Sequence, residues 1–84
     1  MITVLYFARL REALNTGSEQ FVLPPAVHNL NDLRALLATR GGPWAQELAL
    51  NRAIRGAVNQ SLADGVTHIV DGDEIAFFPP VTGG

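Results

Sequence analysis

Residues 71–84 read DGDEIAFFPPVTGG, and this segment joins a turn, a strand and a strand-breaking pair. The DGD triplet predicts a tight turn, and the apolar run after it predicts a β-strand. Side chains alternate along a strand, so Ile75 and Phe77 face one way while Glu74 and Phe78 face the other. Because a carboxylate favours water, the Glu74 face is expected to be the outer one. We therefore expect Phe77 in the core and Phe78 on the surface.

Two prolines follow this strand and predict how the chain leaves the sheet. Pro79 and Pro80 cannot donate to a strand ladder and favour an extended backbone. Val81 to Gly84 are therefore expected to leave the body as a slim tail, which reaches roughly 16 Å counted from Pro80. Gly83 and Gly84 lack a Cβ and fit a narrow channel. We expect the tail to carry a free Gly84 carboxylate into another protein; the bland alternative is a frayed end made of small residues.

The beginning of the chain predicts a strand that complements the last one. Ile2 to Phe7 is a β-branched and aromatic run in which Leu5 and Phe7 share a face. If the first and last strands are neighbours, Leu5, Phe7 and Phe78 form one apolar patch, which on a small domain suggests a partner site. The alternative is that a helix of the same chain covers this face. We favour the patch, because the one long helix is needed on the other face.

The clearest helix is predicted between about Leu30 and Arg40, with leucines at helical spacing and Asn29 or Asn31 as its cap. Gly41 and Gly42 are expected to stop it, and Pro43 to prevent its resumption. The remaining predicted segments are a short helix (Ala8–Leu14), strands at Glu19–Leu23, Ile54–Val58 and Ile75–Phe78, a helical turn (Trp44–Leu48), and a loop with a short strand (Leu62–Ile69). This order predicts a single α+β domain over residues 1–84, a roll with a mixed sheet of four to five strands and one main helix.

Composition excludes several kinds of function. The formal net charge of −2 provides no basic field for nucleic acid. The absence of cysteine excludes disulfides and zinc–thiolate sites, and the two histidines, His28 and His68, lie far apart, so no metal site is expected. No apolar stretch is long enough for a bilayer, and the lack of disulfides favours the cytoplasm. All six basic residues are arginine. A chain with an activated acyl group would benefit from having no lysine amines of its own, but a compositional bias explains the same observation.

Four segments carry a resemblance to a known family. They are VLYFARLRE (4–12), AVNQ (57–60), DGDE (71–74) and AFFPPVTGG (76–84). Together they resemble the small subunits of molybdopterin synthase, which are sulfur carriers related to ubiquitin. The resemblance implies a ubiquitin-like β-grasp fold, with residues 80–84 as a projecting tail.

The resemblance also implies a chemistry. The chain has no phosphate-binding Gly-Lys loop, so an E1-like enzyme would use ATP to adenylate Gly84. A sulfur donor would then give a thiocarboxylate, the covalent sulfur that the chain carries in place of a bound cofactor. The tail would enter the large subunit of a heterotetramer, whose side chains would catalyse formation of the molybdopterin dithiolene. The implied site residues are Gly84 for attachment, Gly83, Thr82, Val81 and Pro80 in the tail, and Phe78, Phe7, Leu5 and Arg11 at the partner interface.

Three alternatives stay open at this point. A sulfur carrier for thiamine or tRNA thiolation would share the fold and the diglycine. A ubiquitin-like protein modifier would form isopeptide bonds through Gly84. A binding module with an inert tail would use the apolar patch alone.

Overall fold

The fold of the chain is known from a computed structural model, which describes residues 1–80. The predictions for the tail residues Val81, Thr82, Gly83 and Gly84 concern residues outside this range. Within it the chain forms a five-stranded sheet and three helices, and none of these helices has the length and apolarity needed to cross a membrane. In chain order the elements are β1 (Ile2–Tyr6), α1 (Ala8–Leu14), β2 (Ser18–Phe21), α2 (Leu30–Ala38), α3 (Gly42–Leu48), β3 (Arg55–Val58), β4 (Ser61–Ala63) and β5 (Glu74–Phe78).

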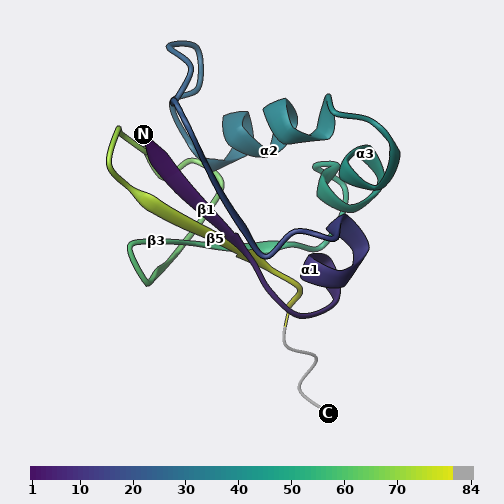
Figure 1. The fold of residues 1–84 in the computed structure, drawn as a ribbon. Coiled ribbons are helices and arrows are strands. Elements are labelled where there is room, and N and C mark those ends of the chain that lie inside the picture. The colour runs from purple at the N-terminus through teal and green to yellow at the C-terminus, as the bar shows by residue number, and fades with distance from the viewer. Residues whose placement is uncertain (81–84) are drawn as a thin grey trace.

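The sheet has the strand order β2-β1-β5-β3-β4, so its last strand in sequence is its central strand in space (Figure 1). The pair β1 and β5 is parallel, with Leu5 opposite Ala76, and the other pairs are antiparallel. This mixed sheet confirms the predicted fold class and the predicted adjacency of the first and last strands. The direction of β5 leads the chain out of the sheet at the end where β1 turns into α1.

One face of the sheet packs on the helices and forms the core. Ile2, Val4 and Tyr6 of β1 and Ile75 and Phe77 of β5 are at most 1% exposed. They cluster with side chains of all three helices: Leu10, Leu14, Leu30, Leu33, Leu37 and Leu48. Since α1, α2 and α3 lie on the same side of the sheet (Figure 1), the opposite face has no helix over it within the described residues. The predicted alternation in both strands, with Phe77 inside, is confirmed.

The start of α2 follows the prediction, and its end does not. The Asn29 side chain accepts a hydrogen bond from the Asp32 backbone N–H at 2.8 Å, and the Asp32 carboxylate accepts one from the His28 N–H at 2.9 Å. This reciprocal cap fixes the first turn. The helix ends at Ala38, so Arg40 lies beyond it.

Helix α3 corrects the reading of Pro43. A new helix begins at Gly42 and holds Pro43 in its first turn, where the missing proline N–H would have no partner in any case. Gly41 adopts a φ of 76°, which breaks the path between the helices. Proline thus starts a helix here instead of blocking one, and the predicted turn at Trp44–Leu48 is the rest of α3.

Candidate functional site

The open face of the sheet brings together the three apolar residues predicted to share it. Leu5 and Phe7 alternate with the buried side chains of β1, and Phe78 does so in β5. The pairing of Tyr6 with Phe77 places Phe7 beside Phe78, and the Phe7 N–H donates to the Phe77 carbonyl at 3.1 Å. Phe7 is 45% exposed, while Leu5 and Phe78 are half-buried.

The same face holds an apolar residue that sequence reasoning missed. Cross-strand pairing aligns Leu5 with Ala76, Ala76 with Ala57, and Ala57 with Leu62. Leu62 is 68% exposed, so the row ends in a large open side chain. The signal in the sequence was weak, because β4 is only three residues long. We call this set the outer-face patch: Leu5, Phe7, Ala57, Leu62, Ala76 and Phe78.

A sharp turn between β1 and α1 keeps Phe7 on this face. Phe7 is extended, with φ −124° and ψ 157°, and Ala8 has a φ of 56°. This left-handed conformation costs a non-glycine residue about 1 kcal/mol. Arg11, one turn further along α1, is exposed, and its Nε lies 3.1 Å from where a Cβ at Gly17 would be. Arg11 therefore lies at the sheet end near Phe7, and its contact with a partner stays a prediction.

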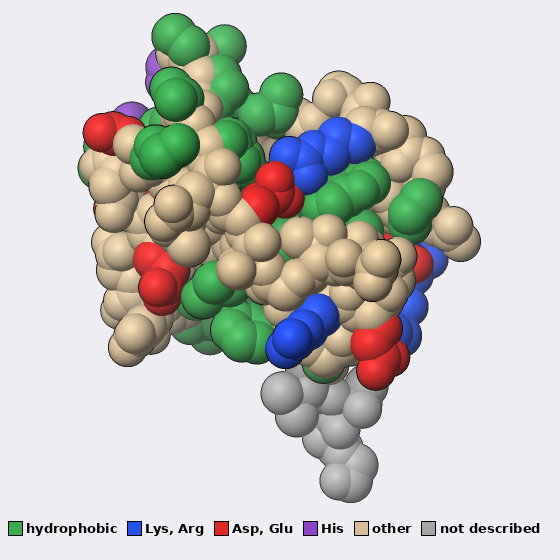
Figure 2. Space-filling model, viewed as in Figure 1, with side chains coloured by type: hydrophobic (Ala, Val, Ile, Leu, Met, Phe, Trp, Pro, Cys, Tyr) green, Lys and Arg blue, Asp and Glu red, His purple; other side chains and the backbone are tan. Residues whose placement is uncertain are grey.

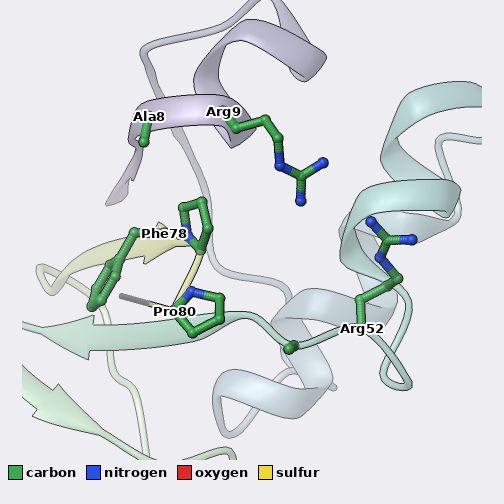
Figure 3. A pocket seen from close by; sticks show the side chains of 7 residues that line it. Ala8, Arg9, Arg52, Phe78 and Pro80 are labelled. Atoms are coloured by element: carbon green, nitrogen blue, oxygen red, sulfur yellow. The ribbon is translucent and has the colours of Figure 1, made fainter. Parts of the chain in front are cut away.

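An open pocket of about 760 Å³ lies where β5 ends. Phe78, Pro79 and Pro80 form one wall. Arg9 of α1 and Arg52 of the loop after α3 point into the same space from the other side (Figure 3). We call this the tail-base pocket; Ala8 and Ala53 complete its lining. It adjoins the outer-face patch, because Phe78 belongs to both.

A buried carboxylate lies between the two arginines of the tail-base pocket. Oε1 of Glu47, in α3, is 3.2 Å from Nη1 of Arg9 and 3.8 Å from Nη2 of Arg52. Glu47 is only 7% exposed, and neither contact has the geometry of a hydrogen bond, so Oε1 has ionic neighbours but no hydrogen-bond donor. The three residues come from separate elements, and sequence reasoning did not connect them.

A second buried charge holds the loop that carries Arg52. Nε of Arg34, in α2, donates to the Leu48 carbonyl at 3.3 Å, and Nη2 donates to the carbonyls of Ala49 at 2.6 Å and Arg52 at 3.2 Å. Burial lowers the pKa of Arg34 from its ordinary value. Its guanidinium satisfies carbonyls that the end of α3 leaves without partners. The backbone of Arg52 is thereby fixed beside the tail-base pocket.

A third charged group lies away from the tail, between β2 and the helices. Glu19 accepts two hydrogen bonds from Arg40, both at 2.8 Å, and one from the Tyr6 hydroxyl at 2.8 Å. Arg40 lies over the Trp44 ring at 4.4 Å. Burial and the neighbouring Glu19 raise the pKa of Tyr6, so its hydroxyl stays protonated and donates. This group joins β1, β2 and α3.

The surface charges are mixed. In the view of Figure 2, acidic and basic side chains lie next to each other, without a field of one sign. No group of three or more His, Cys, Asp or Glu side chains within residues 1–80 could hold a metal ion. Asp73 instead closes the turn before β5, where its carboxylate accepts from the Val70 N–H and the Asn59 amide.

The fold and the patch define a class of protein: a ubiquitin-like β-grasp domain, whose central last strand leads directly to the chain's C-terminal residues. The chain belongs to the ThiS family, whose model matches residues 4–84. It is 41% identical over 85 residues to the molybdopterin synthase sulfur carrier subunit of Escherichia coli (strain K12), and the match covers 100% of both chains.

Two solved structures of other proteins resemble this fold. One is the protein–protein complex of subunits 1 and 2 of the molybdopterin-converting factor from Helicobacter pylori 26695, with a TM-score of 0.65, 26% identity and coverage of 99% of this chain and 97% of that one. The other is small archaeal modifier protein 1 from Methanosarcina acetivorans, with a TM-score of 0.69, 26% identity and coverage of 99% and 95%.

Proposed function

We propose that this chain is the sulfur carrier subunit of a molybdopterin synthase and that the carboxylate of Gly84 carries the sulfur. The observation that supports this most directly is the full-length similarity to the Escherichia coli protein of that name. The fold adds a physical reason, since the central strand β5 passes from the core into Pro79 and Pro80 beside the exposed outer-face patch. The working group is thus attached to the most constrained strand of the sheet.

The chemistry of the proposal begins with activation, because a carboxylate is a poor electrophile. A carboxylate oxygen of Gly84 attacks the α-phosphorus of ATP on an E1-like enzyme, and pyrophosphate leaves. A sulfide equivalent from a sulfur donor then attacks the acyl carbon, and AMP leaves, which gives the thiocarboxylate. The chain has no lysine, so it lacks the Gly-Lys loop that cradles ATP phosphates, and the nucleotide belongs to its partner.

Delivery requires a second partner, the large subunit of the synthase. The Helicobacter pylori neighbour is a complex of subunits 1 and 2 of the molybdopterin-converting factor, which supports a partner subunit for this chain as well. The outer-face patch would dock on the large subunit, with the exposed Phe7 and Leu62 and the half-buried Phe78 as its aromatic and aliphatic anchors. The catalytic side chains would be those of the large subunit. After the sulfur has passed to the acceptor, water would hydrolyse the acyl carbon of Gly84 and restore the carboxylate.

The test is an intact-mass measurement after incubation with ATP, the E1-like enzyme and a sulfur donor. The chain is expected to gain the mass difference between one sulfur and one oxygen. A variant lacking Gly84 is the control and should gain nothing while melting at the same temperature, because residues 1–80 hold the core. An unchanged mass in the wild type, under conditions in which a known carrier is converted, would exclude the proposal.

A protein modifier is the second candidate, because the Methanosarcina acetivorans neighbour has that name. Covalent adducts in an extract of the source cells, absent for the variant lacking Gly84, would favour it. An assay of the product distinguishes the proposed function from that of a sulfur carrier for thiamine or tRNA thiolation. Only the molybdopterin carrier should yield a dithiolene with a molybdopterin synthase large subunit.

A further inference from the structure

We propose that the tail-base pocket is a second recognition site, in which Arg9 and Arg52 together bind an acidic side chain at the mouth of the protein that receives the tail. This inference rests on the proposed function and names a chemical feature of the partner. It concerns charge, whereas the outer-face patch is apolar.

The charge count at the pocket favours an anionic ligand. One carboxylate, that of Glu47, lies between two guanidinium groups, which leaves one net positive charge. A structural ion pair needs only one arginine for one carboxylate. The side chains of Arg9 and Arg52 are 58% and 41% exposed, so both retain N–H donors that face water. A guanidinium presents five donors in a fork that matches a carboxylate.

Ionic contacts bias the two guanidinium groups toward the pocket before any partner arrives. Glu47 contacts both from within the fold. Arg34 fixes the backbone of Arg52, and α1 is anchored by its buried Leu10 and Leu14. Groups that are already ordered lose less conformational entropy on binding. Glu47 and Arg34 are therefore positioning residues, and Arg9 and Arg52 are the binding residues.

The place of the pocket identifies its occupant as a protein. Pro79 and Pro80 line it, and the four residues after Pro80 span at most about 14 Å. A protein whose reactive centre reaches Gly84 must therefore bring the rim of its channel close to Arg9 and Arg52. The pocket is also continuous with the outer-face patch through Phe78, so one partner surface would cover both. The whole chain has a formal net charge of −2, so a local positive site differs in sign from the rest of the molecule. This difference would fix the orientation in which the partner docks.

The experiment measures binding of the molybdopterin synthase large subunit from the same source organism at several salt concentrations. The R9Q/R52Q variant is expected to bind at least about tenfold more weakly, with a shallower salt dependence. The control V22E/A26E makes the same change in net charge at two exposed positions after β2, and should bind nearly as the wild type does. Val22 follows Phe21, which pairs with Ile2 at the opposite end of β1. The R9K/R52K variant keeps the charge but loses the fork, and should recover part of the affinity.

The melting temperature of R9Q/R52Q shows whether weaker binding comes from a loss of fold. The double variant leaves the buried Glu47 carboxylate without counter-charges, so the triple variant R9Q/E47Q/R52Q, which removes that carboxylate, is measured beside it. The inference is overturned if a folded variant binds as the wild type does, or if V22E/A26E weakens binding equally. Failure of the wild type to gain sulfur or deliver it would instead remove the proposed function.

Discussion

At the scale of single residues, Glu19 makes stability depend on pH. Hydrogen bonds from Arg40 hold the pKa of Glu19 below its ordinary value of 4.5. The hydrogen bond from Tyr6 lowers this pKa by a smaller amount, and partial burial opposes both effects. A carboxyl whose pKa is lower in the folded state stabilises the fold above its unfolded pKa, and this contribution is lost as the pH falls through the folded value. The free energy of unfolding is therefore expected to decrease below about pH 4.5.

The matched variant is E19Q, measured by urea unfolding from pH 7 to pH 3. We expect it to lose about 1 kcal/mol at pH 7, a modest figure because Arg40 is partly exposed and water screens the pair. Its stability should also change less than that of the wild type over the acidic range. Parallel pH curves for the two proteins would show that Glu19 is not the titrating group.

At the scale of the strand, β5 offers two neighbouring phenylalanines with opposite roles. Phe77 is 1% exposed and stacks near Tyr6, with ring centroids 6.4 Å apart, while Phe78 lies on the outer-face patch. F77A should lower the free energy of unfolding by about 3–5 kcal/mol through cavity formation. F78A should change the melting temperature far less and weaken binding of the large subunit more. Thermal melts and titration calorimetry on both variants check this, and the reverse result would mean that the register is shifted by one residue.

The contact of β3 with α2 depends on a glycine. A Cβ at Gly56 would lie 2.9 Å from Cδ1 of Leu30, which is itself only 3% exposed. We expect G56A to cost about 1–2 kcal/mol through overpacking, read from denaturant unfolding. A57G, which changes the adjacent outer-face residue in the same strand, serves as the position control and should leave α2 undisturbed. Equal stability of G56A and the wild type would show that Leu30 moves aside freely.

The elements with a strong local signal were predicted well. Alternation in β1 and β5 depends on side chains two residues apart, and the cap at Asn29 depends on residues within one turn, so both are visible in the sequence. The end of α2 was misplaced by two residues because Arg40 suits a last helical turn but instead pairs with Glu19, 21 positions away. Pro43 was misread because proline is excluded from a helix interior but is favoured in the first turn, where it lies in α3.

At the scale of the whole molecule, the candidate site was only partly predictable. Leu5, Phe7 and Phe78 follow from strand parity and one assumed pairing, and the pairing is observed. The contact of Glu47 with Arg9 requires the packing of α1 against α3, which periodicity does not encode. The place of Leu62 in the patch could be predicted only with the position of β4 at the edge of the sheet. Long-range side-chain contacts between weakly patterned segments thus marked the limit of the prediction.

The central position of β5 has a mechanical consequence. A pull on the C-terminal residues acts along the strand, and the hydrogen bonds to β1 and β3 lie across that direction. These bonds are loaded in shear on both flanks and must yield together, unlike those of a peripheral strand, which peel away one by one. The domain should therefore resist a pulling force on its end, which would keep it folded during the proposed withdrawal of the tail from a partner.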